Sequence, residues 1–258
     1  MKTNYGNWIS TPMMKTFCFI TVLFYALSVP LYFIFGLEAG PFYIALILGI
    51  AATLVTLYML YCRYVFSFER GGLMGRIHVY LLDHLPWDGR GTVLDVGCGA
   101  GALSIACAKR FPEAHVAGMD YWPAMWGYAK EQCEQNAQAE GVAARCTFQH
   151  GDAAKIDFPD AHFDAVISNF VFHEVRTQKD KFLLVQEALR TLKPGGVFAL
   201  HDTFGNRDMY GDMDEFVAAL EESGISEITY VPHTEQQIAM PPPLRIMMRG
   251  IGLLYGRK

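Results

Sequence analysis

The sequence predicts an α/β domain, built on a mostly parallel β-sheet with flanking helices, that follows two transmembrane α-helices. Three observations carry this prediction. Residues 1–62 hold almost no charge, an apolar run with an acid and a glycine loop (VLDVGCGAG) stands at 93–101, and strand-like runs then alternate with helical patterns. Such alternation is typical of parallel sheets whose crossovers are helices. The predicted domains are a membrane anchor at 1–65 and the α/β domain at 66–258.

The first two apolar runs are predicted to be transmembrane helices at about 16–36 and 41–62. The runs Phe17–Phe35 and Pro41–Cys62 contain no formally charged side chain. At the helical rise they measure roughly 28 and 33 Å, close to the ~30 Å hydrocarbon core. A cleaved signal peptide is the alternative for the first run, but no small-x-small cleavage pattern follows it. A hairpin that only dips into one leaflet is a further alternative, which the lengths disfavour.

Basic residues predict the orientation of these helices. Lys2 and Lys15 precede the first, and Arg63, Arg70 and Arg76 follow the second, whereas the link between them, which carries Glu38, has no basic residue. The positive-inside rule therefore predicts an integral membrane protein with both termini and the α/β domain in the cytoplasm.

Small residues recur every four positions in the second helix, at Ala45, Gly49 and Thr53. Such a face allows close helix packing. We expect it to meet the first helix of the same chain or, as the alternative, a neighbouring chain in a homo-oligomer. Pro30 lies inside the first helix and is expected to kink it.

The glycine loop lies inside a strand–loop–helix–strand pattern. Thr92–Val96 is a predicted buried strand, Ala102–Arg110 a short helix, and His115–Met119 a second strand that ends in Asp120. This is a βαβ unit with parallel strands. Ligands bind such sheets at the carboxyl ends of the strands, near the first crossover.

The spacing of the glycines indicates which ligand the loop binds. The dinucleotide fingerprint is G-x-G-x-x-G, with a pyrophosphate at the helix N-terminus. Here the glycines are Gly97, Gly99 and Gly101, so the third comes one residue early, and Asp95 precedes the first. A carboxylate at this point suits a cationic ligand better than a pyrophosphate. A nicotinamide-dependent enzyme is the disfavoured alternative.

Composition narrows the partners further. The net charge is −5 and no basic run is present, so no nucleic-acid partner is expected. The cysteines form no C-x-x-C pair and show no zinc spacing. We therefore expect reduced thiols and no metal site. Cys98, which precedes a helix, is the candidate for a reactive thiol.

The loop VLDVGCGAG resembles the first motif of the class I S-adenosylmethionine-dependent methyltransferases. The similarity covers about residues 75–258 and continues through VAGMDYWPAMWGYAKEQ, CTFQHGDAAKIDFP, FDAVISNFVFHEV and ALRTLKPGGVFALHDTF. It looks most like the branch that includes quinone-biosynthesis and other small-molecule methyltransferases. The resemblance implies a Rossmann-like, mostly parallel seven-stranded sheet and S-adenosyl-L-methionine as cofactor.

The resemblance also implies the cofactor contacts. The backbone of Gly97, Gly99 and Gly101 would pass against the methionine part, and Asp95 would complement its ammonium group. Asp120 would accept from both ribose hydroxyls, a charge-assisted bidentate contact. Asp152 would accept from the adenine amino group. Further implied contacts at the strand ends are Tyr121, Trp122, Met125, Ala153 and Asn169.

The catalytic candidates lie at the ends of the fourth and fifth strands. Methyl transfer from a sulfonium needs alignment, exclusion of water and, for a protonated nucleophile, removal of a proton. By resemblance Asn169 lies near the transferred methyl group. His173 and His201 are candidate bases. A packing or hydrogen-bonding role is the alternative for each histidine.

The rest of the chain completes the predicted fold. Met213–Ser223 is a predicted helix, and Ile225–Val231 and Gly250–Gly256 are predicted strands. Pro241–Pro243 predicts a stiff, extended segment. Residues 63–87 are expected to be a linker that, with the hairpin, covers the site.

We therefore expect a membrane-anchored methyltransferase that acts on a small or lipid-like apolar acceptor at the cytosolic membrane face. One alternative is a methyltransferase of small thiols or amines. Another is a catalytically silent, membrane-tethered module that only binds the cofactor. The hairpin is either a route by which the acceptor enters from the bilayer or a simple tether.

Overall fold

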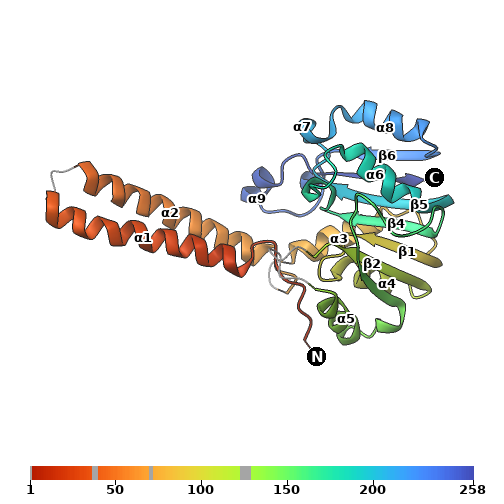
Figure 1. Cartoon of the computed structure of the whole chain (residues 1–258), viewed down its shortest axis with the longest axis horizontal. Helices are drawn as coiled ribbons and strands as arrows, with labels where there is room; N and C mark the ends of the chain where they lie inside the picture. Colours follow the sequence, from red (N-terminus) through yellow and green to blue (C-terminus); the bar gives the residue numbers. More distant parts are fainter. Residues whose placement is uncertain (1, 37–39, 70–71, 123–128) are drawn as a thin grey trace. The chain divides into compact units, whose positions relative to one another are not determined.

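The chain forms two compact units in the computed structural model (Figure 1). One is Gly6–Leu73, and the other combines Met1–Tyr5 with Met74–Lys258. The residues that the structure describes are 2–36, 40–69, 72–122 and 129–258. Glu38, Arg70 and Met125 lie outside them.

The smaller unit is a pair of helices, α1 (Thr11–Phe35) and α2 (Gly40–Val65). Ser10 caps α1 by accepting from the backbone N–H of Met13. The helix continues through Pro30 to its end. Both helices are long and apolar enough to cross a membrane. Helix α1 begins at Thr11, before the predicted start at about 16, and α2 ends at Val65, after the predicted end at about 62.

The small-residue face of α2 packs against α1 of the same chain. A Cβ added at Gly49 would lie 3.1 Å from the ring of Tyr25. The Tyr25 hydroxyl is hydrogen bonded to Thr53 Oγ1 at 3.1 Å. One turn further along, the hydroxyls of Thr21 and Thr56 are 2.9 Å apart. This face is therefore occupied within the chain and is not free to bind a second copy.

The larger unit is built on a seven-stranded sheet in the order β3-β2-β1-β4-β5-β7-β6. Neighbouring strands run parallel except for the pairs β5–β7 and β6–β7, which are antiparallel. The predicted Rossmann-like, mostly parallel sheet is thereby confirmed. The strands are β1 (Gly91–Val96), β2 (Ala114–Asp120), β3 (Cys146–His150), β4 (Phe163–Asn169), β5 (Leu192–Asp202), β6 (Glu227–Val231) and β7 (Gly252–Arg257).

Two hydrophobic cores cover the two faces of this sheet. In β1, Val93 belongs to the core shared with α3, α4 and α5, whereas Leu94 belongs to the core shared with α6, α7 and α8. This alternation follows from the two-residue period of a strand, and burial on both faces is typical of parallel sheets. The helices are α3 (Leu73–Asp83), α4 (Ala102–Arg110), α5 (Lys130–Ala139), α6 (Lys181–Arg190), α7 (Arg207–Tyr210), α8 (Met213–Glu222) and α9 (Pro242–Met247).

Two predictions for connecting segments were wrong. The expected linker at 63–87 contains α3, whose Leu81 and Leu82 are buried in the core. The proline run is extended only at Pro241, because Pro242 begins α9. Proline is tolerated in the first turn of a helix, where its missing N–H has no partner to lose. The predicted last two strands exist but begin two residues later, at Glu227 and Gly252.

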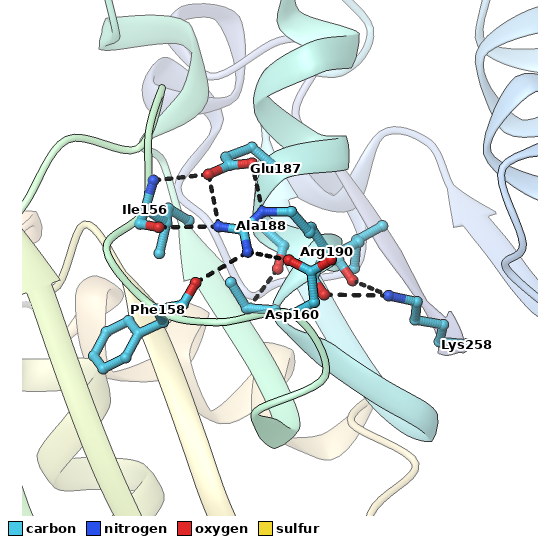
Figure 2. A network of polar contacts seen from close by, with 9 residues as sticks. Ile156, Phe158, Asp160, Glu187, Ala188, Arg190 and Lys258 are labelled. Atoms are coloured by element: carbon cyan, nitrogen blue, oxygen red, sulfur yellow. Dashed lines mark hydrogen bonds and ion pairs between the residues drawn. The ribbon is translucent and has the colours of Figure 1, made fainter.

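A polar network ties the connection between β3 and β4 to α6 (Figure 2). The guanidinium of Arg190 donates to both oxygens of Glu187, to the carbonyls of Ile156 and Phe158, and to Asp160. Glu187 in turn accepts from the backbone N–H of Ile156 at 2.8 Å. Hydrogen bonding to Arg190 lowers the pKa of Glu187. This anchoring fixes the connection that emerges from β3.

Candidate active site

Four neighbouring strands deliver the predicted binding residues to one edge of the sheet. The glycine loop follows β1, Asp120 ends β2, Asp152 follows β3, and Asn169 ends β4. Because these strands are parallel and adjacent, their carboxyl ends lie at one edge, which we call the carboxyl edge. From β1 the sheet first grows on one side, through β2 and β3, and then on the other side, through β4. This topological switch point is where ligands bind in open α/β sheets.

The glycine loop has a backbone that other residues rarely adopt. Gly97, Gly99 and Gly101 all have positive φ angles, at 74°, 57° and 79°. A Cβ added at Gly97 would lie only 2.2 Å from a side-chain carbon of Val171, which follows β4. The N–H groups of Gly97 and Cys98 both donate to the carbonyl of Met119 in β2. The loop is therefore held between β2 and the segment after β4.

Asp120 holds the loop at its centre. Its two carboxylate oxygens accept from the backbone N–H of Gly99 at 2.8 Å and from that of Trp122 at 2.7 Å. The Trp122 indole N–H donates to the Gly99 carbonyl at 2.7 Å. Burial raises the pKa of Asp120, although these N–H groups oppose the rise. Trp122 is thus a partner of the loop itself, and its backbone has a positive φ of 43°.

Asp95 lies beneath the loop, 1% exposed. It accepts from the hydroxyl of Ser104 in α4 at 2.5 Å. Burial, and in smaller part the charge of Asp120, raise the pKa of Asp95 to about 7 against the opposing hydrogen bond from Ser104. A cationic ligand near these two acids would favour their ionised forms and lower both pKa values. The electrostatics therefore fit a cationic ligand, as the sequence indicated.

The residues after β3 form the next part of the edge. Asp152 accepts from the backbone N–H of Ala154 at 2.9 Å and from the Thr177 hydroxyl at 3.1 Å. Ala153 is buried. Tyr121 is 57% exposed, and its ring centroid lies 5.2 Å from that of His150. These residues share the carboxyl edge with Asp120, and Tyr121 presents an exposed ring there.

Asn169 belongs to a buried hydrogen-bond chain. His201 Nδ1 lies 3.1 Å from Asn169 Oδ1, and His201 Nε2 lies 2.7 Å from the Thr234 hydroxyl. Asn169 Oδ1 can only accept, so Nδ1 carries the hydrogen and Nε2 accepts from Thr234. Burial lowers the pKa of His201 to about 3, so the ring is neutral. Asn169 takes part in this hydrogen-bond chain through its Oδ1.

We therefore revise the interpretation of His201 as a base. Both of its ring nitrogens have protein partners, and the side chain is fully buried. The geometry suits a residue that orients Asn169.

His173 has the geometry of an oriented base. Its Nδ1 lies 2.7 Å from Asp202 Oδ1, so Nδ1–H donates and Nε2 is the basic atom of the neutral ring. Burial alone would lower the pKa of His173, but the hydrogen bond and charge of Asp202 raise it. Nε2 lies 3.5 Å from Glu174. A base supported by a carboxylate in this way can take a proton from a substrate.

Asp202 organises the whole segment after β4. It is fully buried and accepts from the backbone N–H groups of Val171, Phe172 and Thr203 as well as from His173. Burial would raise its pKa, but His173 and the N–H donors outweigh burial and lower it. Phe170, between Asn169 and this segment, has a positive φ of 59°.

Several residues that hold the site were missed from the sequence. Asn136 of α5 donates to the Ala100 carbonyl in the loop and to the Asn4 carbonyl near the N-terminus. Ser104, which donates to Asp95, and Thr234, which donates to His201, are the other two. Short polar side chains are common throughout the chain, so no local signal marked these three.

Cys98 was singled out as a candidate reactive thiol, and this was wrong. The side chain is buried, and burial together with the Cys133 thiol raises its pKa well above the ordinary value. A reactive cysteine needs a lowered pKa and access to solvent.

Comparison with known proteins agrees with this geometry. Residues 93–196 match a family model described as a methyltransferase domain. The chain is 33% identical over 171 residues to the demethylmenaquinone methyltransferase of Deinococcus radiodurans, covering 62% of this chain and 66% of that enzyme. It is 30% identical over 169 residues to the same enzyme of Thermus thermophilus, covering 62% and 73%.

A solved structure shows the same fold. Geranyl diphosphate C-methyltransferase of Streptomyces coelicolor superposes with a TM-score of 0.53 at 16% identity, covering 71% of this chain and 80% of that chain. The relationship to the Thermus enzyme covers more than two thirds of that protein. The chain therefore belongs to the class I S-adenosylmethionine-dependent methyltransferases.

Proposed function

We propose that this methyltransferase is anchored in a membrane by its two N-terminal helices and methylates a small, apolar or lipid-like acceptor at the cytosolic membrane face. The observation that carries the proposal is that one chain combines the predicted binding residues at the carboxyl edge with a hairpin whose apolar side chains are exposed. Phe33 is 79% exposed and Ile47 is 62% exposed. A helix of a soluble core would bury such residues. The relatives named above act on demethylmenaquinone, which is itself a hydrophobic compound.

We propose that the cofactor binds at the carboxyl edge. S-adenosylmethionine supplies a methyl group that is already activated on a positively charged sulfur. Asp95 and Asp120, both buried and with raised pKa values, suit its positive charges. We propose that Asp120 also binds the ribose hydroxyls and that Asp152, with Ala153, borders the adenine.

The acceptor side is proposed to lie beyond Asn169. Phe170 stacks edge-on against His201 with centroids 4.8 Å apart, and its ring lies 6.3 Å from that of His173. On α3, the Tyr80 hydroxyl donates to Gln237 at 2.7 Å. These rings offer an apolar, aromatic surface. His173 Nε2 is the atom that would take a proton from the acceptor as the new bond to the methyl carbon forms.

The membrane arrangement follows from the hairpin and the basic residues. We propose that residues 1–65 form the anchor, that 66–258 form the catalytic domain, and that both termini are cytoplasmic. Lys2, Lys15, Arg63 and Arg76 support this orientation through the positive-inside rule. The bilayer and an apolar acceptor are the proposed partners. Self-association through the Ala45, Gly49 and Thr53 face is disfavoured because α1 occupies it.

The acceptor class is tested with the full chain in detergent and methyl-labelled S-adenosylmethionine. One reaction receives demethylmenaquinone or a membrane lipid extract, and the other a panel of small thiols, amines and phenols. We expect label in the organic phase of the first reaction. Label only on a water-soluble compound would favour the thiol or amine alternative, and cofactor binding without any transfer would favour a silent binding module.

The route of entry is tested in nanodiscs by surface dilution. The mole fraction of demethylmenaquinone in the bilayer is varied while its total concentration stays fixed. If the acceptor enters from the bilayer, the rate follows the mole fraction. A rate that depends only on total concentration would make the hairpin a simple tether.

The Thr234–His201–Asn169 chain yields a prediction for cofactor affinity. Thr234→Val removes the hydroxyl that donates to His201, which frees the ring to change tautomer and the Asn169 amide to flip. We expect the Kd for S-adenosylmethionine to rise roughly five- to tenfold, equivalent to about 1 kcal/mol for one buried hydrogen bond. Isothermal titration calorimetry in detergent measures this change.

The controls separate orientation from packing. Thr234→Ser keeps the hydroxyl and should restore the affinity to within about twofold of wild type. Thr229→Val makes the same substitution at an exposed position of β6 and should have no effect. Equal affinities for the two valine variants would refute the role of the chain.

A further inference from the structure

The last connection of the catalytic unit carries an exposed apolar tip. Ile246 in α9 is 80% exposed and the adjacent Met247 is 43% exposed. Leu244 and Met248, on the other side of the same turn, are buried and attach the helix to the domain. A soluble surface seldom leaves two neighbouring large apolar side chains this open without a partner.

Arginines flank this tip. Arg245 and Arg249 are both exposed, and residues 238–251 contain no acidic side chain. The chain as a whole has a net charge of −5. This stretch of the chain is therefore locally basic within an acidic protein. Apolar side chains between arginines are the composition of segments that lie at anionic membrane surfaces.

The tip lies at the carboxyl edge of the sheet, next to the site. β7 begins at Gly252, which pairs with Asp202 at the end of β5. The residue before β7, Ile251, accepts from the backbone N–H of Thr234, whose side chain holds His201. In Figure 1, α9 lies at the end of the sheet opposite the chain's C-terminus. The hydrogen-bond chain to Asn169 and the apolar tip thus belong to one edge.

The N-terminal segment of the catalytic unit is tied to the same edge. Asn4, two residues before the hairpin unit begins, has its backbone N–H on Asn136 at 2.8 Å. Asn136 also holds Ala100 of the glycine loop at 2.9 Å. The first connection to the hairpin therefore leaves the catalytic unit at the carboxyl edge.

We infer that Ile246 and Met247 insert into the interfacial layer of the membrane and that Arg245 and Arg249 bind the phosphates of anionic lipids. The inference rests on the proposed membrane anchoring. It adds a second, reversible membrane contact on the catalytic unit itself. With this contact made, the carboxyl edge faces the lipid surface, and an apolar acceptor reaches Asn169 and His173 without crossing water.

The test uses the full chain in nanodiscs with an environment-sensitive fluorophore at position 246. Ile246→Cys is labelled in a Cys18→Ser background, because Cys18 is the exposed cysteine and the others are buried. Glu222→Cys, at the end of α8, is the matched control. The discs contain either zwitterionic lipid alone or about one third anionic lipid, with and without a lipid-borne nitroxide quencher.

We expect a blue-shifted emission at position 246 and at least twofold quenching by the lipid nitroxide in anionic discs, with neither at position 222. Arg245→Gln with Arg249→Gln should reduce the quenching by half or more. A label at 246 that stays water-exposed in both discs would overturn the inference. So would a blue shift that the lipid nitroxide does not quench, because the cover would then be protein. Equal quenching at position 246 in zwitterionic and in anionic discs would overturn the proposed contact between the arginines and lipid phosphates.

This readout does not depend on catalysis. Insertion of position 246 is measured whether or not demethylmenaquinone is methylated, so the inference and the acceptor proposal fail separately. As the functional arm, Ile246→Asp should lower the rate with a bilayer acceptor about tenfold and leave the Kd for S-adenosylmethionine unchanged. An unchanged rate with the bilayer acceptor would show that the tip has no part in presenting the site.

Discussion

Replacing Asp120 with alanine should weaken S-adenosylmethionine binding by a factor of roughly 100 to 1,000. Asp120 uses its two oxygens to accept from Gly99 and Trp122. A carboxylate offers about four acceptor positions, so about two remain for the ribose hydroxyls. Losing two charge-assisted hydrogen bonds costs about 3–4 kcal/mol. Isothermal titration calorimetry of the detergent-purified chain measures the change.

Two further variants locate the source of this loss. Asp120→Asn keeps the shape but not the charge, and should lie between alanine and wild type. Asp157→Asn removes a carboxylate from an exposed position on the connection after β3 and should bind the cofactor normally. Because burial raises the pKa of Asp120, wild-type affinity should also fall as the pH is lowered through that pKa. An unchanged Kd for Asp120→Ala would remove Asp120 from the site.

Replacing Asp202 with asparagine should destabilise the catalytic unit by about 3–5 kcal/mol, the cost of breaking a buried ion pair. Asp202 accepts from Val171 and Phe172 with one oxygen and from His173 and Thr203 with the other. An amide group would turn a donor toward one of these pairs in either orientation. For a domain of this size we expect Tm to fall by roughly 6–20 °C. Thermal unfolding by circular dichroism in detergent measures this shift.

The pH dependence distinguishes the ion pair from a general packing defect. The pKa of His173 is raised in the folded protein. The stabilisation that protonated His173 provides is therefore complete below the unfolded-state pKa of about 6.5, and it is lost as the pH rises through the folded-state pKa. The pKa of Asp202 is lowered in the folded protein. The stabilisation that ionised Asp202 provides is therefore present above the unfolded-state pKa of about 3.9, and it is lost as the pH falls through the folded-state pKa. The Tm difference should therefore be largest between about pH 4 and 6.5.

Asp208→Asn is the control for this variant, since Asp208 is exposed in α7. It should leave Tm within about 2 °C of wild type. A Tm difference for Asp202→Asn that is the same at pH 5 and pH 8.5 would argue against a charged pair with His173.

The sequence by itself determined the two apolar helices, the parallel sheet and the charge of the ligand. The apolar runs predicted α1 and α2 because a helix that spans lipid must be apolar over its whole length. The βαβ pattern predicted the parallel sheet, and the position of Asp95 before Gly97, Gly99 and Gly101 indicated a cationic ligand. These signals are local, since each depends on residues within a few positions of one another.

Only the tertiary structure decided which side chains act together. Thr234, His201 and Asn169 come from three separate elements, and their contact depends on the register of β5 against β4 and β7. The same packing separates the two candidate histidines. His201 has hydrogen-bond partners on both ring nitrogens, whereas His173 bonds Asp202 through Nδ1 and has Nε2 3.5 Å from Glu174. Neighbours in a sheet are chosen by packing of the whole chain, so the roles of adjacent residues such as His201 and Asp202 cannot be read from their order in the sequence.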